Sequence, residues 1–140
     1  MVIATTLMLL AIAVPASPDI PTIAPPQAYH LVERGEAILI DVREQVEIAD
    51  GMATPAWWMP YSRIRRNPEG FAQTLKTMPP EKLLIFYCAK GGRAEMAASR
   101  AREFGRRVRN MGAFSDWVKA GLPIRIPFSS ATMRDHERIR

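Results

Sequence analysis

The chain has 140 residues, of which 48% are apolar and 24% are charged, and its formal net charge is +5. This length suits one globular domain, which excludes repeat arrays and two-domain enzymes, and the apolar fraction is too high for a wholly disordered chain. The positive charge lies in the second half, where residues 81–140 carry 13 basic and 6 acidic side chains. No RNA-binding signature accompanies this charge, so we expect no nucleic-acid partner.

Cysteine and histidine are scarce in this sequence. Cys88 is the single cysteine, so an internal disulfide and a cysteine-cluster metal site are both excluded. The two histidines, His30 and His136, lie far from Cys88 and show no ligand spacing. We therefore expect neither a metal nor a cofactor.

The N-terminus carries an apolar run over residues 2–14, followed by small residues up to Ala16. This pattern predicts a signal peptide over residues 1–16, with cleavage after Ala13 or Ala16. The run is shorter than the roughly 18 residues of a membrane span, so we expect a periplasmic or secreted protein with no stable membrane span after signal removal. Because no Lys or Arg precedes the run, an uncleaved anchor or a mis-assigned start codon stays open as an alternative.

The rest of the chain divides by composition. Residues 17–26 contain four prolines and are predicted to form a Pro-rich linker. A single domain is predicted over residues 27–124. Residues 125–140 end in mixed charges and are expected to be a frayed or partly helical tail.

Helical and strand patterns alternate along the domain. The patterns predict helices or helical turns at 26–34, 45–49, 67–77, 93–104 and 114–120, and strands at 37–40, 56–59, 82–87 and 107–111. The run at 82–87 is continuously apolar, as is typical of a central parallel strand covered on both faces. The alternation predicts an α/β domain with a mainly parallel sheet.

Residues 88–93, Cys-Ala-Lys-Gly-Gly-Arg, follow this central strand and precede a helix. Ligands of open α/β sheets bind at this position. We expect Gly91 and Gly92 to let the backbone curl, so that successive N–H groups form an anion cradle at the start of the helix. Helix N-termini and nearby cations favour the thiolate, which is the nucleophilic form of cysteine. The alternative is that Cys88 is only a small buried hydrophobic residue.

Three motifs together resemble a single-domain rhodanese. They are Cys-x-x-Gly-x-Arg after an apolar strand, Asp41-Val42-Arg43-Glu44 after an earlier strand, and Gly121-Leu122-Pro123 after a helix that carries a tryptophan. The resemblance covers roughly residues 26–124. It implies a rhodanese-like three-layer α/β/α domain with a central, mainly parallel, five-stranded sheet.

The resemblance also implies a sulfurtransferase. Cys88 would take the sulfane sulfur of thiosulfate or a similar anionic donor as a persulfide and pass it to cyanide or a thiol. The substrate-binding loop would consist of Ala89, Lys90, Gly91, Gly92 and Arg93. In that loop Lys90 would attract the donor, and Arg93 would bind the anion or brace the loop. Asp41 and Arg43 would support the site from behind, either directly or as a strand-end cap and an ion pair.

The chain departs from this family in one stretch. Where the family usually reads Gly-His-Ile-Pro-Gly-Ala and then Asn-Ile-Pro, residues 51–60 read Gly-Met-Ala-Thr-Pro-Ala-Trp-Trp-Met-Pro. Trp57 and Trp58 are adjacent on a predicted strand, so they should point to opposite faces. If one of them lines the site, it favours a bulkier or protein-borne acceptor over cyanide.

Two rival functions follow from the same residues. A phosphatase of similar fold would need five residues between the cysteine and the arginine, but only four separate Cys88 from Arg93. A non-enzymatic sulfur carrier or protein-binding module stays open, because a delivery protein would keep the same cysteine and loop.

Overall fold

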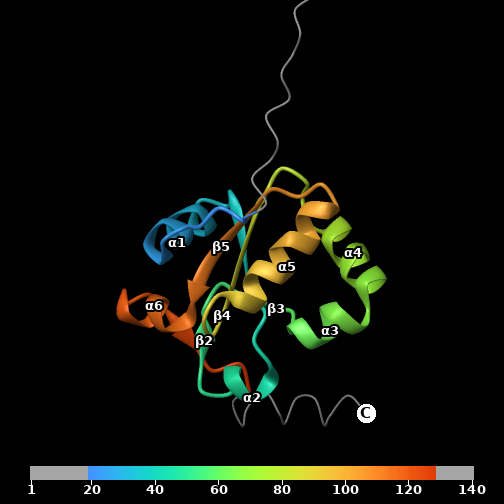
Figure 1. Ribbon diagram of the computed structural model, residues 1–140. Coiled ribbons are helices and arrows are strands. Elements are labelled where there is room, and N and C mark those ends of the chain that lie inside the picture. The colour runs from blue at the N-terminus through green and yellow to red at the C-terminus, as the bar shows by residue number, and fades with distance from the viewer. Residues whose placement is uncertain (1–18, 129–140) are drawn as a thin grey trace, which may run out of the picture.

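The computed structural model describes residues 19–128, which form a parallel four-stranded sheet covered by helices on both faces (Figure 1). The strand order is β3 (Trp57–Trp58), β1 (Ala37–Asp41), β4 (Leu83–Cys88) and β5 (Val108–Ala113). The continuous apolar pattern of β4 places it inside the sheet, between β1 and β5. The carboxyl ends of β1 and β4 therefore lie at the same edge.

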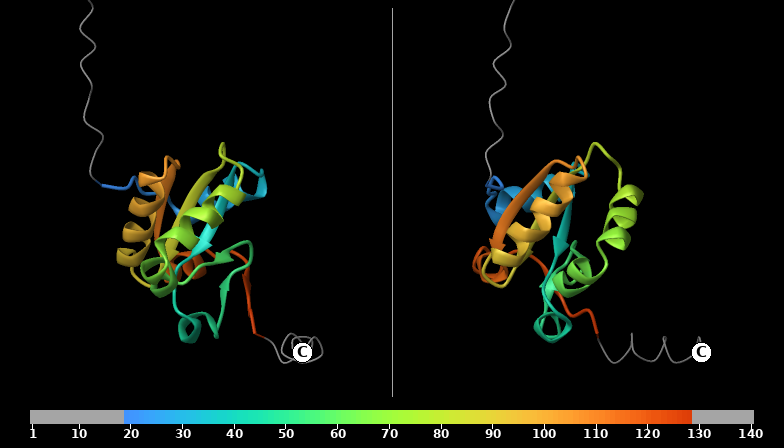
Figure 2. Two further views of the ribbon diagram at one scale, coloured as in Figure 1. Left: turned by 90° about the vertical axis from the view of Figure 1, so that its right-hand side faces the viewer. Right: turned by 45° about the vertical axis from the view of Figure 1, so that its right-hand side comes forward.

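Helices form the two outer layers of the domain (Figure 2). One face carries α1 (Pro25–Glu33) and α6 (Phe114–Lys119), and the other carries α3 (Tyr61–Arg66), α4 (Pro68–Thr77) and α5 (Gly92–Glu103). The short α2 (Gln45–Ile48) follows the carboxyl end of β1. The predicted three-layer α/β/α fold is confirmed. Among residues 19–128, no helix is both long and apolar enough to cross a membrane.

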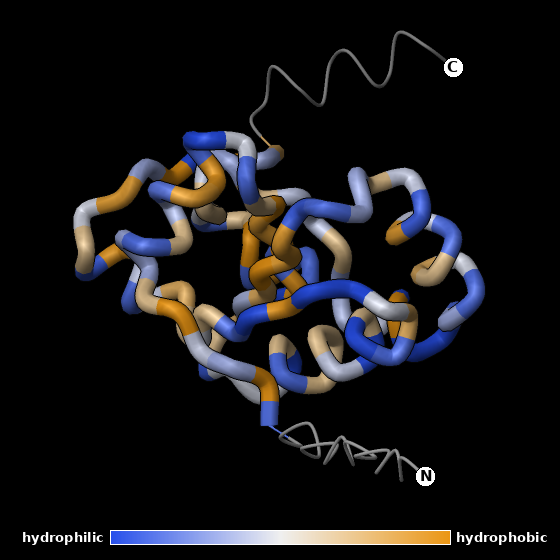
Figure 3. Tube along the Cα trace, turned by 90° about the horizontal axis from the view of Figure 1, so that it is seen from above, coloured by the Kyte–Doolittle hydropathy of each residue, from blue (hydrophilic) through white to orange (hydrophobic). Residues whose placement is uncertain are grey.

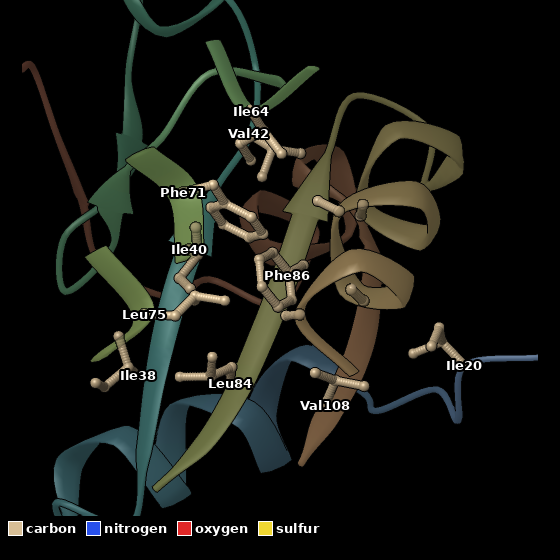
Figure 4. Close-up of a cluster of buried hydrophobic side chains, with 14 of the residues drawn as sticks. Ile20, Ile38, Ile40, Val42, Ile64, Phe71, Leu75, Leu84, Phe86 and Val108 are labelled. Atoms are coloured by element: carbon tan, nitrogen blue, oxygen red, sulfur yellow. The ribbon is translucent and has the colours of Figure 1, made fainter. Parts of the chain in front are cut away.

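Two apolar clusters, one on each face of the sheet, make up the core. Alternate side chains of a strand enter different clusters, so Phe86 and Cys88 face α5 whereas Tyr87 faces α6. Figure 4 shows the cluster on the α5 face, where Phe86 lies among side chains of β1, α4 and β5. In Figure 3 the most hydrophobic residues gather along the central strands.

The sheet differs from the predicted one in its number of strands. It has four strands, and within residues 19–128 β5 makes one further parallel pairing, a single bridge between Thr22 and Asn110. A separate antiparallel pair joins β2 (Met52–Ala53) to β6 (Ile124–Arg125). This pair and helix α3 were not predicted, because two-residue strands and a one-and-a-half-turn helix carry no measurable periodicity.

The segment predicted as a linker packs against the domain from Ile20 onward. Ile20 is buried in the cluster on the α5 face, and residues 21–23 run beside Asn110 of β5 with two backbone hydrogen bonds. Helix α1 begins at Pro25 within the same segment. At the other end, Arg125 belongs to β6 although it was assigned to the tail. The predicted signal peptide and the tail after residue 128 lie outside the described residues.

Replacement of Phe86 by alanine should test the importance of the central strand. Phe86 is fully buried in β4, so Phe86→Ala should lower the free energy of unfolding by about 3–5 kcal/mol in urea titrations. Val46→Ala is the control, because Val46 is 82% exposed, and it should change stability by less than about 0.5 kcal/mol. Equal effects of the two substitutions would contradict the placement of β4 at the centre of the core.

Candidate active site

Cys88 is the last residue of β4, and its side chain is 1% exposed on the α5 face of the sheet. The backbone N–H of Gly91 donates a hydrogen bond to the Cys88 sulfur at 3.0 Å. A backbone N–H at this distance is a donor that a negatively charged sulfur can accept from. The sulfur thus lies where the loop after β4 turns back to meet it.

Gly91 gives the loop its shape. Its φ of +104° lies in the region that favours glycine, and a Cβ at this position would come within 3.4 Å of the Gly112 Cα atom. Gly92 instead begins α5, where an added Cβ would meet nothing within 4 Å. Of the two glycines expected to let the backbone curl, Gly91 has a positive φ and Gly92 does not. The first N–H groups of α5 have no acceptor within the helix, and they lie at its positive end, beside the loop.

Arg93 pairs with Glu47 of α2 rather than pointing into open space. Its two terminal nitrogens donate to the two Glu47 carboxylate oxygens, each at 2.6 Å. These hydrogen bonds raise the pKa of Arg93 further above its usual range and lower the pKa of Glu47 to about 2. Glu47 also accepts a hydrogen bond from the Glu44 backbone N–H at 2.7 Å. Of the two roles expected for Arg93, this geometry favours the brace.

Asp41 and Arg43 form a buried ion pair behind the loop. The Arg43 guanidinium donates to both Asp41 carboxylate oxygens and, at 2.8 Å, to the Gly51 carbonyl. It also lies 3.9 Å from the centre of the Phe114 ring, a cation–π contact. Burial works to lower the pKa of Arg43, but the hydrogen bonds and charge of Asp41 outweigh it and raise that pKa. Both residues support the structure around the loop, and their polar groups point at each other.

Glu44 connects the segment after β1 to α3 through hydrogen bonds. Its carboxylate accepts hydrogen bonds from the Ser62 backbone N–H at 3.0 Å and from the Ser62 hydroxyl at 2.7 Å. Glu44 is also the N-cap of α2. The segment 41–47 therefore connects β1, α2, α3 and the start of α5.

An open hollow of about 510 Å³ borders the loop, lined by Arg43, Ala89, Phe114, Ser115, Val118 and Lys119. Lys90 is exposed on the loop itself. A second groove, of about 490 Å³, lies between β3, α3 and α4 and contains no residue of 88–93. The hollow beside Ala89 is therefore the candidate entrance for a ligand.

Trp57 and Trp58 differ in environment, as their alternation predicts. Trp57 is 49% exposed. Trp58 packs against the core cluster on the α6 face, and its indole N–H donates to the Arg43 carbonyl at 2.9 Å. Both line the second groove and not the hollow beside Ala89.

The structure adds residues that sequence analysis did not identify. Glu47 was overlooked because its partner Arg93 is 46 residues away, and the hollow lined by Phe114 and Lys119 could not be foreseen without the packing of α6. The spacing of Glu44 and Glu47 in the capping box was the one local signal available. Among residues 19–128, no group of three or more His, Cys, Asp or Glu side chains could hold a metal ion.

Removal of the Glu47 charge should destabilise the domain in a pH-dependent way. Glu47→Gln should lower the free energy of unfolding at pH 7 by about 1–2 kcal/mol, because Arg93 loses its charged partner. Since folding lowers the pKa of Glu47 from its ordinary value to about 2, this stabilisation is fully present above the ordinary value. It is lost as the pH falls through about 2.

The measurement is urea unfolding of both proteins between pH 2 and pH 7, in which the difference should shrink toward the acid end. Glu36→Gln is the matched control, because Glu36 forms an exposed pair with Arg34 and its loss should cost less than about 0.5 kcal/mol. If the free energies of unfolding of the wild type and Glu47→Gln were equal at pH 7, or if their difference grew in acid, the ion pair of Arg93 and Glu47 would not brace the loop.

Several known proteins are similar to this chain in sequence or in fold. A sulfurtransferase of Allochromatium vinosum is 27% identical over 102 residues, which cover 71% of this chain and 89% of that protein. The human single-domain sulfurtransferase TSTD1 is 30% identical with a TM-score of 0.59, and the match covers 71% of this chain and 96% of that one. A thiosulfate sulfurtransferase from Pseudomonas aeruginosa superposes with a TM-score of 0.64 over 77% of this chain and 20% of that one. At 22% identity, that last likeness shows the fold alone.

The family follows from the sequence match as well as from the fold. A family model described as the rhodanese-like domain matches residues 24–120. That range contains every strand of the parallel sheet and the whole loop after Cys88. The chain therefore belongs to the rhodanese-like domain family.

Proposed function

We propose that the protein is a sulfurtransferase that carries sulfur as a persulfide on Cys88. The observation that carries the proposal is the place of the only cysteine, at the end of β4, with the Gly91 N–H on its sulfur and the start of α5 beside it. The sulfurtransferases among the similar proteins support the same role. One good nucleophile in a setting that tolerates negative charge is sufficient for a two-step transfer, so no partner histidine is required.

In the first step the Cys88 thiolate attacks the sulfane sulfur of thiosulfate. A bond forms between the two sulfurs, the S–S bond of thiosulfate breaks, and sulfite leaves with the electron pair. The enzyme then holds a persulfide anion, so the total charge is conserved and no oxidant is needed. In the second step cyanide or a thiolate attacks the outer sulfur, and the Cys88 thiolate is released.

Positive charge around the loop suits an anionic donor. Lys90 is exposed on the loop, and Lys119 lines the hollow beside Ala89. The Cys88 side chain is 1% exposed, so a donor has to approach it past the loop, and the hollow borders that loop at Ala89. Arg93 and Arg43 are held by carboxylates, so the lysines and the N–H groups of α5 attract the donor.

A non-enzymatic role as a sulfur carrier or protein-binding module is the second candidate. The exposed Trp57 and the groove beside it offer a surface that a protein acceptor could contact. An enzyme and a carrier differ in turnover, since an enzyme transfers sulfur many times per molecule and a carrier about once.

Sulfur transfer from thiosulfate to cyanide tests the proposal. Thiocyanate formation by the wild type should exceed the amount of protein many times over, and Cys88→Ser should abolish it. Lys76→Ala is the control, because Lys76 lies in α4 away from the loop, and its rate should equal that of the wild type. Thiocyanate equal to the protein concentration would favour the carrier, and transfer by Cys88→Ser would overturn the role of Cys88.

We also propose that the protein is exported, on the basis of the apolar run at residues 2–14. Expression of the full chain in a Gram-negative host should yield periplasmic protein that begins at residue 14 or 17. Full-length protein in the cytoplasm would contradict export.

A further inference from the structure

Asn110 of β5 lies directly behind the reactive loop. It is buried, and its side-chain nitrogen donates to the Gly91 carbonyl at 3.1 Å and to the Glu95 carboxylate at 2.9 Å. Its side-chain oxygen accepts a hydrogen bond from the Gly112 N–H at 2.9 Å. Both N–H donors and the acceptor of this amide are therefore in use, which fixes its orientation.

An irregularity in the sheet brings Asn110 to this place. The pairing of β4 with β5 shifts between Phe86 and Tyr87, so that Phe86 pairs with Asn110 and Tyr87 pairs with Gly112. A β-bulge re-aims the side chains around it, and such bulges are frequent beside active sites. Here the bulge lies at the carboxyl end of the sheet, next to the Cys88 loop.

Glu95 links this amide to the N-terminal segment. One carboxylate oxygen accepts from Asn110, and the other accepts from the Ile20 backbone N–H at 2.8 Å. The backbone of Asn110 also bonds the segment directly, since its N–H donates to the Pro21 carbonyl and its carbonyl accepts from the Ile23 N–H. A continuous set of hydrogen bonds therefore runs from Ile20 through Glu95 and Asn110 to Gly91.

We infer that Asn110 and Glu95 are positioning residues that hold the Gly91 N–H on the Cys88 sulfur. The Gly91 carbonyl accepts from the Asn110 side chain as well as from the Glu95 backbone N–H at 2.9 Å, and the Gly91 N–H donates to the sulfur. With the carbonyl held, rotation about the glycine backbone is restricted, and the N–H stays directed at the sulfur. Because Glu95 in turn holds Asn110, residues 20–23 form part of the support of the site.

This inference deepens the proposed function and rests on it for its effect on catalysis. In the first step the negative charge is already present on the attacking Cys88 thiolate, and in the second step it develops on the Cys88 sulfur as that sulfur leaves. A fixed N–H donor stabilises this charge without reorganisation during the reaction. Loss of the hydrogen bond from Asn110 to the Gly91 carbonyl should therefore lower kcat more than it raises KM for thiosulfate.

Two paired substitutions separate positioning from stability. Asn110→Asp keeps the shape and the acceptor for Gly112, but it removes both donors and places a negative charge beside Glu95. Adding Glu95→Gln to Asn110→Asp supplies an amide that can donate to the new carboxylate and still accept from Ile20. The double variant should therefore recover stability, while the Gly91 carbonyl keeps the Glu95 backbone N–H but still lacks the Asn110 donor.

The experiment measures exchange of the Gly91 amide proton by NMR, together with kcat and KM for thiosulfate. Gly91 exchange should be about tenfold faster in Asn110→Asp and in the double variant, and kcat should fall about tenfold in both with KM within about twofold. Asn67→Asp is the control, since Asn67 caps α4 through its oxygen and an aspartate can do the same. It should leave Gly91 exchange and kcat unchanged.

Each other result overturns the inference or part of it. An unchanged exchange rate of the Gly91 amide in Asn110→Asp would overturn the inference that Asn110 positions the Gly91 N–H, whether or not the wild type transfers sulfur. Recovery of both stability and kcat in the double variant would show that the network is only structural. If the wild type transferred no sulfur at all, the proposed function would fail, while Gly91 exchange would still decide whether Asn110 holds the loop.

Discussion

The positive φ of Gly91 is the constraint on which the candidate site depends. It turns the chain sharply after β4, so that the N–H of residue 91 meets the Cys88 sulfur and residue 92 begins α5. The missing side chain of Gly91 also leaves room for Gly112 of β5. A Cβ on residue 91 would come within 3.4 Å of the Gly112 Cα atom. A single backbone conformation thus brings the cysteine, a hydrogen-bond donor and the positive end of a helix together.

The two arginines around the loop, Arg43 and Arg93, stabilise its conformation through ion pairs. Arg93 is bound to Glu47, which joins α5 to α2, and Arg43 is bound to Asp41 of its own segment and to the Gly51 carbonyl. A charge already paired with a carboxylate attracts a further anion weakly, so these pairs contribute rigidity. For the proposed anionic donor, the groups available near the loop are the N–H groups at the start of α5, Lys90 on the loop and Lys119 at the hollow. In the proposed transfer, preorganised N–H dipoles would need little reorganisation as charge moves between sulfur atoms.

Local patterns in the sequence were sufficient to predict most of the fold and the place of Cys88 at the end of the central strand. The apolar run at 82–87 identified the central strand, and the capping residue Asn67 marked the start of α4. Sequence patterns did not predict the structure where it depends on residues that are distant in the sequence. Ile20 is held by Glu95, 75 residues away, so a proline-rich composition alone suggested a linker. The role of Arg93 could not be decided for the same reason, because Glu47 becomes its partner only after folding.

Cys88 is proposed to be a nucleophile that forms a persulfide. The most direct test is the intact mass of the protein before and after incubation with thiosulfate, for the wild type and for Cys88→Ser. The account predicts a gain of one sulfur atom on the wild type alone, which a thiol reductant removes. An unchanged mass of the wild type, or the same gain on Cys88→Ser, would contradict it.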